Sequence, residues 1–127
     1  MRFIPHAVHG IFDYLAGLLL LASPWLFGYV HEQPVSTDMA MIFGGGLMLY
    51  TALTNFEVGI VRLLPFPVHL GLDVLMGAAL LGSPILFSTG GTAAVVFVVF
   101  GILELAVAAM TRGSRSSPGH PQFPSWT

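Results

Sequence analysis

The sequence predicts an all-α membrane protein of four transmembrane helices, and three observations support this prediction. The chain of 127 residues is 55% hydrophobic and 8% charged, whereas soluble domains carry about 25% charged residues, so we expect lipid to surround it. Four apolar runs each approach the ~20 residues that cross the hydrocarbon core of a bilayer. The second pair of runs also repeats the first pair, which predicts two tandem two-helix repeats.

The apolar runs are separated by segments rich in glycine, proline and hydroxyl residues, which mark turns. We place the runs at about 7–28, 38–56, 67–87 and 92–111. The first helical hairpin then occupies residues 1–57 and the second occupies residues 58–112. Residues 113–127 contain three prolines with several serines and glycines, and this composition predicts a disordered tail.

The repeat is visible as direct sequence similarity. The segment HGIFDYLAGLLLLASPWLF, from His9, aligns without gaps with HLGLDVLMGAALLGSPILF, from His69, and roughly half of the positions match. Further along, FGGGLMLYTALTN from Phe43 aligns more loosely with FGILELAVAAMTR from Phe100. Two crossings return the chain to its starting side, so the copies are parallel and are expected to be related by a pseudo-two-fold axis along the membrane normal.

The basic residues predict the orientation, because Lys and Arg are in excess in cytoplasmic loops. The chain has no lysine, and its arginines are Arg2, Arg62, Arg112 and Arg115. These positions precede the first helix, separate the second from the third, and follow the fourth. We therefore predict that both termini, and the tail, are cytoplasmic.

The triplet Ser23-Pro24-Trp25 ends the first predicted helix, and Ser83-Pro84 recurs at the matching place in the third. A two-helix membrane repeat with this triplet resembles the SPW-repeat family of small bacterial integral membrane proteins, over about residues 5–111. The second copy departs from the pattern, because Ile85 replaces the tryptophan. The resemblance implies the fold and a place in the bacterial cytoplasmic membrane. It implies no particular activity, because none is assigned to the family.

The Ser-Pro motif has a structural and a functional interpretation. Proline ends or kinks a helix, and tryptophan prefers the headgroup boundary, so Pro24 and Trp25 predict a helix end with an interfacial anchor. In the alternative, the helix is broken there, and its freed carbonyls, with Ser23 and Ser83, line a solute or ion site.

Glycines on the predicted helices indicate close packing, because small residues let membrane helices approach one another. The candidate positions are Gly17, Gly44, Gly45, Gly46, Gly77 and Gly82. The packing could join helices of one chain or of two chains.

Two His-Asp pairs lie within the apolar runs. His9 with Asp13, and His69 with Asp73, are spaced i, i+4, so each pair shares one face of its helix. Parallel repeats would bring both pairs to the same depth.

Glu104 is expected in the same layer, since at 1.5 Å per residue it lies about 12 Å before Arg112, as Asp13 lies about 12 Å beyond Pro5. Tyr50 of the second run is a further candidate member, with Thr51 and Thr54. Carboxylates in hydrocarbon cost about 2.5–3.5 kcal/mol each, so these residues should face inward and are candidates for function.

Four interpretations of this polar layer stay open. Each His-Asp pair forms a charge-assisted hydrogen bond that staples the first and third helices, with Arg62 or Arg112 completing it. Alternatively, the layer is a proton or cation relay. Alternatively, the two pairs and Glu104 bind a transition metal. In the last interpretation, His9 and His69 are axial ligands of a haem.

The function class is predicted mainly from what the sequence lacks. It has no cysteine, no phosphate loop and no nucleophile–base motif, so we expect no enzyme, and a net charge of -2 indicates no nucleic-acid partner. We expect a non-catalytic accessory or self-associating subunit whose partners are the bilayer, further copies or another membrane protein. A small transporter or proton/cation pathway is the alternative, and a haem- or metal-binding protein comes third; no cofactor is otherwise predicted.

Overall fold

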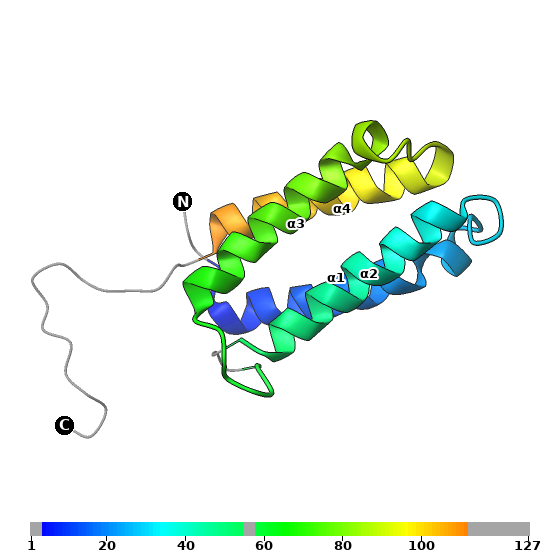
Figure 1. Ribbon diagram of the computed structural model, residues 1–127. Helices are drawn as coiled ribbons and strands as arrows, with labels where there is room; N and C mark the ends of the chain where they lie inside the picture. The colour runs from blue at the N-terminus through cyan, green and yellow to red at the C-terminus, as the bar shows by residue number, and fades with distance from the viewer. Residues whose placement is uncertain (1–3, 55–57, 112–127) are drawn as a thin grey trace, which may run out of the picture.

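The structure, a computed structural model, describes residues 4–54 and 58–111, and within them the chain is all-helical (Figure 1). The helices are α1 (His6–Leu26), α2 (Pro34–Ala52), α3 (Phe66–Leu86) and α4 (Gly91–Met110). In these residues β-structure is limited to two isolated bridges. Three helices of the described chain, α1, α3 and α4, are long and apolar enough to cross a membrane. The all-helical membrane fold class is therefore confirmed, while the predicted tail, Arg2, Arg112 and Arg115 lie outside the described residues.

Helix α2 differs from its predicted bounds and is not among the three membrane-crossing candidates. It starts at Pro34 instead of residue 38, because proline is pre-organised for the first helical turn. The early start adds Ser36 and Thr37 to the helix, which lowers its mean hydropathy. It ends at Ala52 because the following link folds back, and the amides of Ile60 and Val61 donate to the Ala52 carbonyl.

The helices form two antiparallel hairpins that lie side by side, α1 with α2 and α3 with α4 (Figure 1). The hairpins meet through smaller contacts of α1 with α4 and of α2 with α3. Helix α1 begins and α4 ends at the same end of the bundle, where the Ile4 amide donates to the Met110 carbonyl at 3.0 Å. A bridge of Ile4 to Thr111 at this end matches a bridge of Leu64 to Thr54.

Within each hairpin, two glycines bring the helix backbones into contact. A Cβ atom added at Gly44 would lie 2.5 Å from the Leu21 nitrogen of α1 and 2.6 Å from the Gly17 carbonyl oxygen. In the second hairpin, a Cβ atom at Gly101 would lie 2.8 Å from the Gly77 carbonyl oxygen. A side chain at these positions would separate the helices.

The other candidate glycines do not make such an approach. Among the described residues, a Cβ atom at Gly45 or Gly46 would meet nothing within 4 Å, and one at Gly82 would meet only Leu86 of its own helix, at 3.5 Å. These three positions therefore make no close helix contact within the described chain, and packing against a second chain stays a prediction for them. Gly101, for which the sequence predicted no packing role, lies opposite Gly77.

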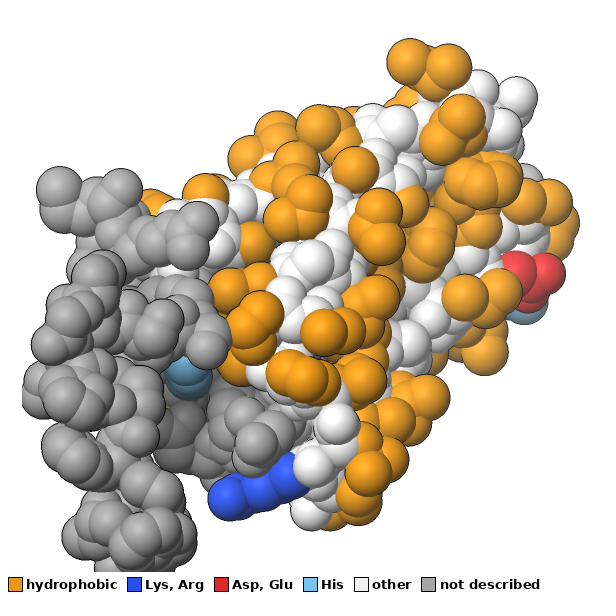
Figure 2. All heavy atoms as spheres, turned by 60° about the vertical axis from the view of Figure 1, so that its left-hand side comes forward, with side chains coloured by type: hydrophobic (Ala, Val, Ile, Leu, Met, Phe, Trp, Pro, Cys, Tyr) orange, Lys and Arg blue, Asp and Glu red, His pale blue; other side chains and the backbone are white. Residues whose placement is uncertain are grey.

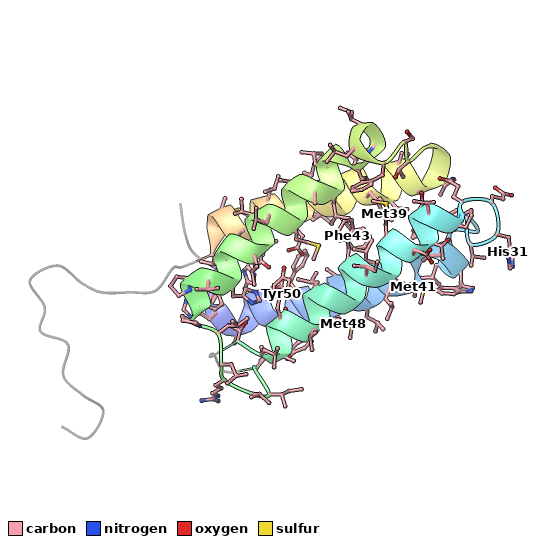
Figure 3. The ribbon with its side chains drawn as sticks, in the orientation of Figure 1. His31, Met39, Met41, Phe43, Met48 and Tyr50 are labelled. Carbon is pink, nitrogen blue, oxygen red and sulfur yellow. The ribbon has the colours of Figure 1, made fainter. Side chains whose placement is uncertain are left out.

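An apolar core fills the end of the bundle away from the chain termini. It contains Leu20 and Leu80, both fully buried, and an aromatic group in which Phe97 lies edge-on to Tyr29 and Phe43. Figure 3 shows Phe43 on the side of α2 that faces the second hairpin. Burial of these side chains joins the hairpins at one end, and the polar cluster described below joins them at the other.

Replacing Gly44 by alanine should lower the free energy of unfolding by about 1–3 kcal/mol, the usual cost of overpacking. The added methyl group meets backbone atoms of α1, which cannot rotate away. Unfolding in mixed micelles with a rising fraction of SDS measures the change. The control is Gly45→Ala, one residue along, where the expected change is within about 0.5 kcal/mol. Equal losses in the two variants would contradict this account of the α1–α2 contact.

Candidate functional site

Two histidines and two aspartates form a closed ring between α1 and α3. His9 Nε2 lies 2.7 Å from Asp73 Oδ2 and 2.9 Å from Asp13 Oδ2. His69 Nε2 lies 2.7 Å from Asp13 Oδ2 and 3.2 Å from Asp73 Oδ2. All four side chains have 0% exposure. We call these four residues the His/Asp ring.

The shortest contacts of the ring cross between the helices. The i, i+4 pairs on one helix are present, but each histidine lies closer to the aspartate of the other helix. Each carboxylate is thus shared by two imidazoles, and α1 is tied to α3. Arg62, expected as a possible further partner, is exposed.

Two threonines hold the outer nitrogens of the histidines. Thr111 Oγ1 lies 2.6 Å from His9 Nδ1, and Thr54 Oγ1 lies 2.8 Å from His69 Nδ1. Each threonine donates its own hydroxyl proton to the carbonyl four residues earlier, that of Val107 or Tyr50. The hydroxyl oxygen must therefore accept, so each Nδ1 carries a proton.

Thr54 follows the end of α2, and Thr111 follows the end of α4. Their hydrogen bonds therefore connect the His/Asp ring of α1 and α3 to the other two helices. Thr54 was a candidate member of the polar layer, but Thr111 was not considered. The alignment of Phe43 with Phe100 pairs these two threonines, so the repeat itself could have indicated Thr111. Thr51 is buried but donates to the Leu47 carbonyl of its own helix.

Tyr50 and Glu104 make the ring environment asymmetric. The Tyr50 hydroxyl donates to Asp73 Oδ1 at 2.6 Å. The repeat alignment places Val107 at the position that matches Tyr50, so Asp13 Oδ1 has no corresponding phenol; it is buried without a hydrogen-bond partner among the described residues. Glu104 is 1% exposed, and its Oε1 likewise has no partner there. The ring is therefore not fully satisfied on the α4 side.

The Phe66 side chain packs against both histidines of the His/Asp ring. Phe66 stacks on His69, with ring centroids 5.4 Å apart and planes at 8°, and lies edge-on to His9 at 5.7 Å. His6 also stacks on Phe66, with ring centroids 3.8 Å apart. This packing keeps water from the ring, which strengthens its electrostatic interactions. Phe66 was not singled out in the sequence.

The ring atoms could hold a metal ion. The two Nε2 and two Oδ2 atoms all lie within 4.8 Å of one another, and imidazole with carboxylate is a common ligand combination.

The serine of the Ser-Pro motif, at the far end of α1 and α3, supplies a hydrogen-bond donor in place of the amide that proline lacks. Pro24 has no amide proton to give to the Leu20 carbonyl, and Ser23 Oγ donates to that carbonyl at 2.7 Å instead. Likewise, Ser83 Oγ donates at 2.7 Å to the Leu80 carbonyl, which lies four residues before Pro84.

The first copy of the motif has two further features. Ser23 Oγ also contacts the Tyr29 hydroxyl, at 2.6 Å, so the motif secures the loop after α1. The Trp25 side chain is 57% exposed, one residue before α1 ends at Leu26. This position suits contact with lipid headgroups.

A family model for the SPW repeat domain matches residues 7–111, which include the His/Asp ring and both Ser-Pro pairs. The chain belongs to the SPW repeat family. No curated protein and no solved structure matches it. The match to the SPW repeat domain therefore agrees with the resemblance seen in the sequence.

In this SPW repeat protein, Ser83→Ala should lower the free energy of unfolding by about 1–3 kcal/mol, because the Leu80 carbonyl loses its donor in a buried place. The double variant Ser83→Ala/Pro84→Ala restores a backbone amide to that carbonyl and should recover most of the loss. Micelle unfolding measures both changes, with Thr92→Ala at an exposed site of α4 as control. No recovery in the double variant would contradict the proposed role of the serine.

Proposed function

We propose that this chain is a non-catalytic protein of the bacterial cytoplasmic membrane, an accessory or self-associating subunit whose two hairpins are clasped by the His/Asp ring. The observation that supports this most is the complete burial of the ring. Groups with 0% exposure cannot reach a substrate, but they can hold α1 against α3. The ring therefore acts on the protein itself.

The outer surface supports a place in lipid. Exposed large apolar side chains occur on all four helices, among them Leu15, Ile42, Leu75 and Val95. Figure 2 shows apolar side chains across the middle of the viewed face, with charged side chains at two opposite ends. Such an arrangement is expected of a bundle whose helices of about 20 residues cross the hydrocarbon core.

The orientation and the duplication are parts of the same proposal. Contacts recur in both hairpins: Gly17 with Gly44 corresponds to Gly77 with Gly101, and the ring threonines occupy matching positions. These recurrences support parallel copies about a two-fold axis. Arg62, in the link between the hairpins, supports a cytoplasmic position for that end of the bundle.

Self-association is supported by the surface of α2. Gly45 and Gly46 lie on this helix with open space beside them, so a helix of a second chain could approach closely there. Exposed Ile42 and Leu49 flank the glycines and would pack against the approaching helix.

The orientation predicts which loops a reagent can reach. Because the chain has no cysteine, Glu32→Cys in the α1–α2 loop and Ile60→Cys in the α2–α3 link each provide one reactive thiol. A membrane-impermeant maleimide should label Glu32→Cys in intact spheroplasts and Ile60→Cys only after lysis. The reverse pattern would contradict the proposed orientation.

Self-association predicts that fluorescently tagged protein, captured in nanodiscs directly from the membrane, bleaches in more than one step. Gly45→Leu should shift the distribution toward single steps, because the side chain fills the open surface of α2.

The matching control is Gly71→Leu, since Gly71 is exposed on α3 with nothing within 4 Å of an added Cβ atom.

Proteoliposomes with the wild-type chain should conduct no more cations than protein-free vesicles. Single-step bleaching, together with a cation flux that Asp13→Asn/Asp73→Asn abolishes, would replace this proposal by the cation-pathway alternative.

A further inference from the structure

The His/Asp ring has the size of a coordination sphere. Nitrogen and oxygen alternate around it, with edges from 2.7 to 3.2 Å. Zinc binds histidine nitrogen and carboxylate oxygen at about 2.0–2.2 Å, so neighbouring donor atoms around it lie about 3 Å apart, close to these edges. The imidazole centroids of His9 and His69 are 5.4 Å apart, which suits one shared ion and is too close for a planar macrocycle between them.

The outer contacts of the histidines are those expected of metal ligands. A histidine that binds a metal usually donates its other ring N–H to a fixed acceptor, which sets its tautomer and orientation. Thr111 and Thr54 are such acceptors for Nδ1, and both are fully buried. The two Nε2 atoms are left to face the carboxylates.

Two carboxyl oxygens at the ring lack a hydrogen-bond donor among the described residues. They are Asp13 Oδ1 and Glu104 Oε1, and both are buried. Glu104 lies within electrostatic range of Asp13, Asp73 and His9. Unpaired buried carboxyl oxygens are costly, and the ionic ring alone does not explain them. A cation at the ring would attract both.

Charge balance also favours exchange of a metal for protons. Without metal, a proton on each Nε2 satisfies the carboxylates, so two imidazolium groups balance two aspartates. One divalent ion can displace these two protons and leave two neutral imidazoles with the same two carboxylates. The total charge of the ring is unchanged, so the exchange adds no net charge to a site that water does not reach.

We propose that the His/Asp ring is a binding site for one divalent transition-metal ion, zinc being the best match, with Glu104 as a nearby carboxyl group outside the ligand set. Two imidazoles and carboxylates, without thiolates, form the donor set that zinc and its neighbours in the first row accept. The proposal goes beyond the clasp, because the ring joins α1 to α3 with or without the ion.

The test begins with the full-length chain, expressed with added zinc and purified in mild detergent. Elemental analysis should find about one zinc per chain. X-ray absorption at the zinc edge should show a first shell of nitrogen and oxygen atoms with the scattering pattern of two imidazoles. After removal of the metal, competition with a chelator measures the affinity for zinc.

The variants Asp73→Asn and His69→Gln should each weaken zinc binding at least tenfold, and Glu104→Gln should weaken it less. The matched controls are Asp38→Asn and His31→Gln, which change an exposed carboxylate and an exposed imidazole away from the ring and should leave the affinity unchanged. Circular dichroism and gel filtration establish that each variant is folded.

If a ring variant does not fold, the X-ray absorption spectrum of the wild-type protein decides. A first shell without imidazole, or wild-type protein that stays free of zinc at every supply, would overturn the proposal. Equal binding by ring variants and controls would also overturn it, as an adventitious ion only. The clasp is judged separately. If the wild-type protein binds no zinc and Asp73→Asn still lowers its free energy of unfolding, the metal site is wrong and the clasp is supported.

Discussion

The structure depends on the cost of placing charged groups in hydrocarbon. Each carboxylate in a membrane helix costs about 2.5–3.5 kcal/mol unless another group satisfies it. In this chain the partners lie on helices of different hairpins, since the shortest contacts join His9 to Asp73 and His69 to Asp13. The hairpins must therefore meet at one depth and one rotation. Thr54 and Thr111 extend the same requirement to α2 and α4.

Apolar side chains cannot set this register alone, because lipid tails are as apolar as the helices. Distance within each hairpin is set by glycine contacts, where a Cβ atom at Gly44 or Gly101 would meet backbone. At the end away from the ring, the Ser-Pro pairs let α1 and α3 run on through a proline without leaving a carbonyl unpaired. The Ser23 hydroxyl then connects the helix end to buried Tyr29.

Among the many positions at which the two hairpins differ, two lie at the ring. Tyr50 supplies a donor to Asp73, while Val107 at the matching position supplies none to Asp13. In the repeat alignment, Glu104 of the second hairpin corresponds to Leu47 of the first. Similar contacts thus form both hairpins, and the differences leave two carboxyl oxygens without a hydrogen-bond partner among the described residues. This asymmetry is visible in the repeat alignment, although its meaning depends on which helices are neighbours.

The sequence by itself determined the helical membrane fold, the bounds of α1, α3 and α4 to within two residues, and the placing of each His-Asp pair on one helix face. These properties follow from local composition and helical periodicity. Only the tertiary structure decided that each aspartate is shared across α1 and α3, that Thr111 and Phe66 complete the ring, and that Gly45 and Gly46 remain open. Those outcomes depend on the distance and rotation between helices, and no local pattern encodes these two quantities.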